Sequence, residues 1–269
     1  MSLILTLRVP DGIVAAADSL STAQNLLEIV ADEIKMECPN CKKEFSKPEL
    51  RLPPFPVPFS ASSYTQKLFS LFGQFALGCH GRGIINKRST YYHVNKFQMD
   101  HKGMETQTLT QIRDAFIKYI EEQLLAELPK YKEEAPEKWL PFGFHLNGYE
   151  AVDGSPVGVT YEVMIGRKNV INRYDVLGCT VGGDIRVVQK LWEIGKENPR
   201  REFKYPLFSL QDAIDLSEFL ISATSSFQKF SSDVPTVGGQ VDVALVTPFH
   251  HFQWIKRKTL MEKLEVSNE

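Results

Sequence analysis

The chain has 269 residues, of which 43% are hydrophobic, enough for one large domain or two small ones. Its formal net charge of −2 shows no bias toward nucleic acid or other polyanions. The sequence has no apolar run of membrane-spanning length and no signal-peptide pattern, so we expect a cytoplasmic protein without nucleic-acid or membrane partners. Four cysteines are too few for a disulfide scaffold, which agrees with a reducing compartment.

The first nineteen residues predict a β-hairpin. Residues 3–9 are apolar and β-prone, Pro10 to Gly12 form a turn signal, and residues 13–17 are β-branched or small. The second predicted strand ends at an acid, Asp18. The hairpin should therefore return Asp18 to the beginning of the chain.

Ser2 is a candidate nucleophile, because a small second residue permits removal of Met1. A terminal serine would carry a hydroxyl and a free amine on one residue. An α-amine titrates near ~8, so it can act as the base for its own hydroxyl. Serine is also a common second residue in cytosolic proteins, so the position alone does not establish catalysis.

Residues 32–59 differ in composition from the rest and contain six of the fifteen prolines. Such a segment cannot be a regular helix or a central strand, and it predicts an inserted arm. Its apolar residues Phe55, Val57 and Phe59 favour contacts with other subunits, because a lone exposed arm should not carry them.

Cys38 and Cys41 within this arm resemble half of a zinc knuckle. A structural zinc site needs four ligands, and the chain has no second CxxC. The pair is therefore either two reduced thiols, a local disulfide, or half of a zinc site that a second subunit or histidines complete.

After the arm, residues 62–71 and 75–79 predict two paired strands, with Lys67 in the first. The stretch 77–83 is rich in glycine, including Gly81, which suits a close backbone approach or an ordinary turn. It matches neither common nucleotide-binding motif, so no cofactor is expected.

Residues 84–130 predict helical structure, with a capping box at Thr108 and Gln111. A charged loop over 130–141 leads into three predicted strands. One apolar face is expected on the helix and consists of Leu109, Ile112, Phe116, Ile120 and Leu124. The strands are expected at 142–152, 157–165 and 170–181.

The last third predicts two more helices and a final pair of strands. Asp184 would cap a helix over 185–196, and Ser209 with Asp212 would cap a second one. Strands are expected at 240–247 and 249–256, before an exposed tail over 258–269. The second helix should bury Leu210, Ile214, Ser217, Ile221, Thr224 and either Phe227 or Gln228, widened by Ala213, Leu220 and Phe230. This order of elements predicts an α+β fold.

Three motifs together resemble the proteasome β-subunit family and its bacterial relatives. They are the opening hairpin through Asp18-Ser19, the triplet Lys67-Leu68-Phe69, and the run from Gly238 to Pro248. The likeness covers most of the chain, except the arm and the tail. It implies a single domain over 1–269 with the four-layer αββα sandwich of N-terminal-nucleophile hydrolases.

The resemblance also implies a peptidase or amidase with four site residues. Ser2 falls on the nucleophile position, Asp18 on the acid, Lys67 on the catalytic lysine and Gly81 on the glycine whose N–H forms the oxyanion hole. The expected partners are a peptide or protein substrate, other copies of the chain in a self-compartmentalising ring, and an ATPase of unknown identity.

Two departures from the family pattern leave other functions open. The place of a family serine is occupied by Gly182-Gly183, and valines at 234 and 237 replace an aspartate and a serine near the terminal amine. The alternatives are a catalytically inactive assembly protein on the same fold and an acyl-transfer, peptide-ligating enzyme on the same site.

Overall fold

The chain divides into two compact units in the computed structural model. The first comprises Met1–Ser21 and Ser62–Glu269, and the second comprises Thr22–Ala61. The structure describes residues 2–27, 30–31, 34–37, 41–42, 44–47, 50–51, 55–129, 141–197, 200, 202–231 and 234–258.

The first sheet of the larger unit has the strand order β16-β1-β2-β17-β18, with antiparallel pairing throughout. Its central hairpin confirms the predicted one, and both of its strands are completely buried. The strands are β1 (Leu3–Val9), β2 (Gly12–Ala17), β16 (Gly178–Gly183), β17 (Asp242–Thr247) and β18 (His251–Lys256).

The second sheet has the order β15-β14-β13-β10-β9 and is also antiparallel. A separate short hairpin, β11 with β12, follows β10 along the chain. The strands are β9 (Leu68–Leu71), β10 (Phe75–Gly81), β11 (Ile84–Ile85), β12 (Arg88–Ser89), β13 (Phe142–Val152), β14 (Ser155–Ile165) and β15 (Val170–Tyr174).

The strand expected over 170–181 is in fact two strands in different sheets. β15 pairs with β14 in the second sheet, whereas β16 pairs with β1 in the first. The chain crosses between the sheets at residues 175–177. A local apolar pattern does not reveal such a crossing, because the pattern of each half is the same whichever sheet accepts it.

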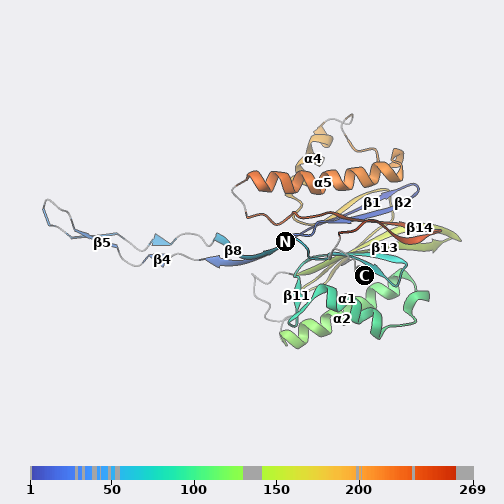
Figure 1. Ribbon diagram of the computed structural model, residues 1–269, viewed down its shortest axis with the longest axis horizontal. Helices are drawn as coiled ribbons and strands as arrows, with labels where there is room; N and C mark the ends of the chain where they lie inside the picture. The colour runs from blue at the N-terminus through green and yellow to red at the C-terminus, as the bar shows by residue number, and fades with distance from the viewer. Residues whose placement is uncertain are drawn as a thin grey trace, which may run out of the picture. The chain divides into compact units, whose positions relative to one another are not determined.

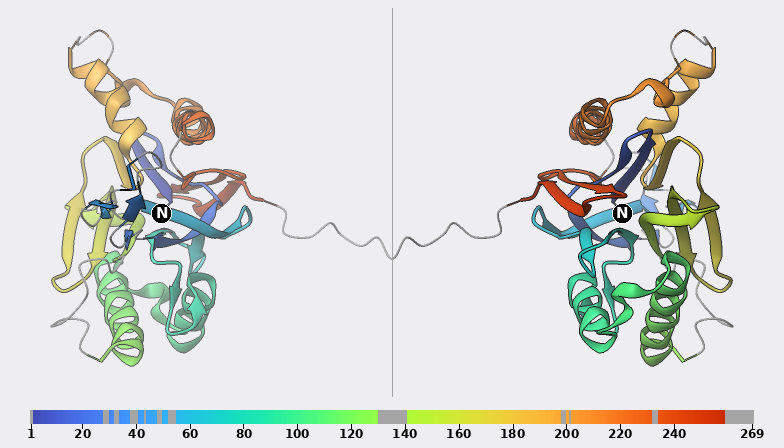
Figure 2. Two further views of the ribbon diagram at one scale, coloured as in Figure 1. Left: turned by 90° about the vertical axis from the view of Figure 1, so that its left-hand side faces the viewer. Right: turned by 90° about the vertical axis from the view of Figure 1, so that its right-hand side faces the viewer.

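Helices lie on the outer faces of the two sheets, as Figures 1 and 2 show. α5 packs its apolar residues on the outer face of β1 and β2, and α2 packs on β13. The α+β class is therefore confirmed. The helical elements are α1 (Thr90–Asp100), η1 (Met104–Thr106), α2 (Leu109–Glu127), α4 (Arg186–Glu197), η3 (Tyr205–Leu207) and α5 (Leu210–Phe230).

Both predicted capping boxes are present, at Thr108 with Gln111 and at Ser209 with Asp212. All five predicted apolar positions of α2 are buried. On α5 the choice between two residues is settled: Gln228 is 3% exposed and Phe227 is 62% exposed. The expectation for Phe230 is wrong, since that side chain is 83% exposed at the end of the helix.

The buried apolar residues of the layer between the sheets are small or branched, and three aromatic side chains pack against them at its edge. β1 also directs Thr6 and Arg8 into this layer, where both are buried. Arg8 Nη1 donates hydrogen bonds of 2.9 Å to the hydroxyls of Thr160 and Thr180. The polar face of β1 thus faces the other sheet.

The smaller unit consists of paired short strands, and it includes most of the predicted arm. Because Pro56 and Pro58 are two residues apart, both can lie along the unpaired edge of a two-stranded ribbon. The pairs are β3 (Ser21–Leu27) with β8 (Phe55–Ser62), β4 (Val30–Ala31) with β7 (Leu50–Arg51), and β5 (Ile34–Glu37) with β6 (Glu44–Lys47).

The sequence predicts an exposed tail over 258–269, and the residues after Lys258 lie outside the described part of the chain. Lys258 itself is buried, contrary to that prediction. In the parts of the chain that the structure describes, no helix has the length and hydropathy needed to span a bilayer.

Candidate active site

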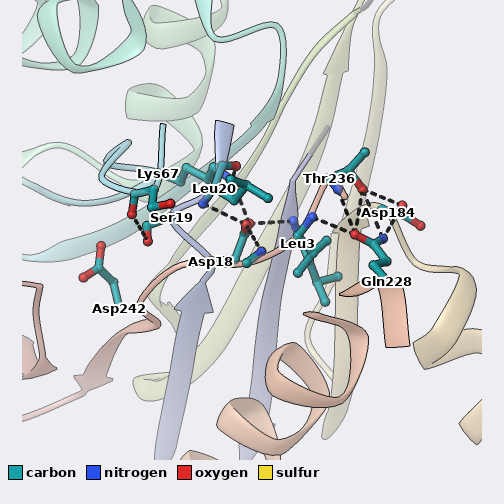
Figure 3. Close-up of polar contacts among 12 residues, drawn as sticks. Leu3, Asp18, Ser19, Leu20, Lys67, Asp184, Gln228, Thr236 and Asp242 are labelled. Carbon is teal, nitrogen blue, oxygen red and sulfur yellow. Dashed lines mark hydrogen bonds and ion pairs between the residues drawn. The ribbon is translucent and has the colours of Figure 1, made fainter. Parts of the chain in front are cut away.

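The carboxylate of Asp18 is completely buried and accepts four hydrogen bonds (Figure 3). Oδ1 accepts from the backbone N–H of Leu3 at 2.9 Å and from Lys67 Nζ at 2.8 Å. Oδ2 accepts from the backbone N–H groups of Leu20 at 3.1 Å and Gly238 at 3.0 Å. One side chain therefore joins four separate places in the chain.

Lys67 lies directly before β9, with its side chain almost fully buried. Its backbone carbonyl accepts from Cys79 N–H at 2.7 Å, and its ammonium also donates to the carbonyl of Leu20. Burial lowers the pKa of Lys67, while the charge of Asp18 opposes that shift. The ion pair thus keeps a cation in a place where burial alone would disfavour it.

Ser2 is 6% exposed, and its peptide bond to Leu3 is held at both polar atoms. The Ser2 carbonyl accepts from the backbone N–H of Asp184 at 2.7 Å, and the Leu3 N–H donates to Asp18. Gly183 has φ +95°, and a side chain there would overlap the Ser2 carbonyl. A glycine is therefore required opposite the first residues of the chain.

The structure brings Ser2, Asp18 and Lys67 to one end of the two sheets. The Leu3 N–H and Lys67 Nζ donate to the same oxygen, so they lie within about two hydrogen-bond lengths, roughly 6 Å, of each other. Lys67 is thus close to the peptide bond that Ser2 forms. This agrees with the sequence expectation for these three residues.

Gly81 ends β10 in a left-handed conformation, with φ +80°. A side chain there would overlap the carbonyl of Pro141, so the close approach that requires glycine is to the protein's own backbone. Gly81 and Gly183 line one cavity of about 290 Å³. The remaining lining residues are His80, Pro141, Glu162, Met164, Val181, Gly182 and Ile185.

Asp184, Gln228 and Thr236 form a hydrogen-bonded cluster (Figure 3), and the backbone N–H of Asp184 connects it to the Ser2 carbonyl. Asp184 Oδ2 accepts from Thr236 Oγ1 at 2.7 Å and from Gln228 Nε2 at 2.9 Å. Hydrogen bonds from Arg186 lower the pKa of Asp184 to about 2. The Asp184 carboxylate therefore stays ionised, and the backbone N–H of the same residue holds the Ser2 carbonyl.

Sequence reasoning missed this cluster as a unit. It identified Asp184 only as a helix cap, and the Asp184 carboxylate does accept from Arg186 N–H at 3.4 Å. It left Gln228 as one of two options, and it noted Thr236 only as adjacent to a family serine position. The available signal in the sequence was Gln228 at a position on the apolar face of the helix, since Gln is seldom buried without partners.

A second buried ion pair joins Lys258 to Asp242 at the beginning of β17. Both the backbone N–H and the ammonium of Lys258 donate to the Asp242 carboxylate. Asp242 pairs in the sheet with Ala17, which is the residue directly before Asp18. The charge of Lys258 contributes to lowering the pKa of Lys67, after the larger effect of burial.

The cysteines give no metal site in the described part of the chain. Cys41 is exposed, whereas Cys38 lies outside the described residues, so the zinc prediction stays a prediction. No cluster of three or more His, Cys, Asp or Glu side chains suited to a metal occurs among the residues that the structure describes. Burial raises the pKa of Cys79, which disfavours its thiolate and argues against it as an alternative nucleophile.

Comparisons with known proteins do not assign the chain: no model of a protein family matches the sequence, and no curated protein matches it either.

Proposed function

We propose that the protein is a proteasome-like N-terminal-nucleophile peptidase or amidase with the four-layer αββα sandwich of that family. Ser2 would be the nucleophile after removal of Met1, in a self-compartmentalising ring of identical subunits. The observation that carries the proposal is the buried Lys67–Asp18 pair beside the Ser2–Leu3 peptide bond.

In the proposed reaction, the free amine of Ser2 takes the proton of the Ser2 hydroxyl while its Oγ attacks the substrate carbonyl. The positive charge of Lys67 stabilises the oxygen nucleophile, and Asp18 holds Lys67 in place. The backbone N–H of Gly81 would stabilise the oxyanion. The leaving amine takes the proton, and water then hydrolyses the acyl ester to release the second product.

The cluster beneath Ser2 supports this proposal despite the departures from the family pattern. Thr236 lies one residue before the position where the family has a serine, and it binds Asp184. Asp184 in turn holds the Ser2 carbonyl. We therefore interpret Asp184, Gln228 and Thr236 as a rebuilt support for the N-terminal residue.

The test uses one protein in two forms. A removable N-terminal tag that is cleaved directly before Ser2 gives a blocked and a free form of the same chain. Incubation with an electrophilic peptide probe should add one probe to the free form, as measured by intact mass, and none to the blocked form. Ser2→Ala should abolish labelling and Ser2→Thr should retain it. Equal labelling of the blocked form would place the nucleophile elsewhere.

A second candidate is a catalytically inactive assembly protein on the same fold. Val237 favours it, because this side chain is 1% exposed where active family members have a polar serine near the amine. Under this alternative the native protein keeps Met1 and forms oligomers, and the free form is not labelled. An acyl-transfer enzyme would differ again, since added amines would capture the acyl group faster than water does.

A further inference from the structure

Two buried histidines in the layer between the sheets each have a ring nitrogen without a hydrogen-bond partner. They are His80 Nε2 and His145 Nε2, and no group among the described residues bonds to either. Leaving a buried polar atom unpaired costs about 1–3 kcal/mol. Native proteins rarely contain such atoms unless water, an ion or a ligand satisfies them. Two such nitrogens near each other therefore indicate a bound species.

The sheet register explains why these side chains meet. In one row across the sheet, His80 on β10 lies opposite Gly143 on β13, which lies opposite Met164 on β14. In the next row, Gly78 lies opposite His145. Because opposed residues point to the same face, each large side chain extends over a glycine. The two rings and the thioether thus share one region of the layer.

Distances from two glycines show that the two imidazole nitrogens and the thioether sulfur lie close together. At Gly182 on the facing sheet, a side chain would begin 2.7 Å from His80 Nε2 and 3.1 Å from His145 Nε2. At Gly143, it would begin 2.6 Å from Met164 Sδ, and it would overlap His80 Nε2. Two imidazole nitrogens and one sulfur are therefore grouped around positions that only glycine leaves open.

Both rings are buried, and burial favours the neutral imidazole, which is the form that binds metals. His145 Nδ1 lies 3.2 Å from Thr6 Oγ1, which orients the ring and leaves Nε2 available. A partner on the second nitrogen is the usual arrangement for a histidine ligand.

The donor set selects among cations. Two imidazoles and a thioether are neutral donors, and a soft thioether favours monovalent copper over zinc or magnesium. Arg8 acts on His145, and Lys67 and the N-terminus act on His80, and these positive charges would oppose a divalent ion more strongly than a monovalent one. Glu162 lies opposite His145 in the register and lines one cavity with His80 and Met164.

We propose that His80, His145 and Met164 form a buried binding site for monovalent copper, Cu(I). The proposal does not depend on the function proposed for Ser2, because none of the three residues belongs to the proposed catalytic set. A metal–imidazole bond is about 2 Å long, so binding an ion requires the two rings, whose centroids are 6.2 Å apart, to turn their Nε2 atoms toward it.

The experiment measures Cu(I) affinity by anaerobic competition with a chromogenic Cu(I) chelator. The protein carries Cys38→Ser and Cys41→Ser, because a CxxC pair would itself bind Cu(I). One equivalent per chain is expected. His80→Leu and His145→Leu should each weaken binding at least tenfold, since loss of mere support around a metal ligand already costs about 10–100-fold. Met164→Leu should weaken it less.

His93→Leu is the matched control. His93 is also buried, but both of its ring nitrogens are bonded, Nδ1 to the Tyr119 hydroxyl and Nε2 to the Ile85 carbonyl. Its replacement should leave Cu(I) binding unchanged. Thermal unfolding of each variant reports whether it is folded.

X-ray absorption of the copper-loaded Cys38→Ser, Cys41→Ser protein tests the site without any change at the histidines. A shell of two nitrogens and one sulfur is expected. The proposal is overturned by a lack of stoichiometric uptake, by a copper shell without imidazole, or by full affinity in the folded His80→Leu and His145→Leu variants. A crystal structure in which only a water bridges the two nitrogens after copper soaking would also overturn it.

Discussion

Two buried lysine–aspartate pairs lie in the larger unit, and their surroundings differ. In the pair Lys67–Asp18 the side chains are 5% and 0% exposed, and in the pair Lys258–Asp242 they are 2% and 1% exposed. By burial and chemical type the two pairs are equivalent. Only the first lies at the beginning of the chain.

The difference lies in what each carboxylate joins. Asp18 accepts hydrogen bonds from four residues in different parts of the chain, whereas Asp242 accepts from the backbone N–H and the ammonium of one residue, Lys258. The second pair fastens the end of the described chain to β17. The first organises the surroundings of Ser2. Burial of an ion pair therefore does not identify a functional site, but the chain segments that it connects can.

The strongest test of this comparison replaces each lysine by methionine. Both Lys67→Met and Lys258→Met leave a buried carboxylate without its cation, so each should cost about 3–5 kcal/mol of unfolding free energy in denaturant titrations. Labelling of the free Ser2 form should fall by about 10²–10³ in Lys67→Met, because the nucleophile loses its neighbouring charge. In folded Lys258→Met it should change only a few-fold. Equal losses of labelling would show that the pairs act alike.

Replacing each aspartate by asparagine compares the two pairs through the free energy of unfolding. Each oxygen of Asp18 accepts from two donors and each oxygen of Asp242 from one, so an amide nitrogen leaves two donors unpaired in Asp18→Asn and one in Asp242→Asn. Asp18→Asn should therefore destabilise more than Asp242→Asn, by about 1–3 kcal/mol, the usual cost of an unpaired buried group. Chemical denaturation of the two variants at pH 7 measures this difference. A larger loss in Asp242→Asn would contradict the role of Asp18 as the main junction.

A smaller effect is expected in the pH dependence of labelling. The proposed mechanism requires Lys67 to be protonated, so labelling should decline as pH rises through the pKa of Lys67, which burial places below that of an ordinary lysine. The charge of Lys258 lowers this pKa further. Lys258→Met should therefore move the alkaline decline of the labelling rate to higher pH. No movement, or movement to lower pH, would argue against coupling between the two pairs.

The smallest effect concerns the support beneath Ser2. Thr236→Val removes one hydrogen bond to Asp184 and should cost about 1 kcal/mol at pH 7. Thr224→Val is the control, because the Thr224 hydroxyl bonds to a carbonyl of its own helix.

The stability losses of these two threonine variants should respond differently to a fall in pH. The pKa of Asp184 is lowered, so its stabilisation is complete above its unfolded value near pH 4 and is lost as pH falls to about 2. The deficit of Thr236→Val in unfolding experiments should shrink over that range, whereas the deficit of Thr224→Val should not. Parallel behaviour of both variants would show that Thr236 does not act through Asp184.

The sequence by itself determined the local elements. Apolar periodicity and turn signals predicted the opening hairpin and the buried face of α2, and the capping residues marked the beginnings of α2 and α5. These features depend on residues close together in the chain. The sequence also placed Ser2, Asp18 and Lys67 as a set, but only through the resemblance to a family.

Tertiary structure alone decided the rest. The crossing from β15 to β16 depends on which sheet accepts each strand, and the burial of Lys258 depends on its long-range partner Asp242. The same holds for Gln228, which is chosen over Phe227 because Thr236 and Asp184 offer it partners. A buried polar group is stable only where distant segments supply its hydrogen bonds, and its neighbours in the sequence do not indicate which segments those are.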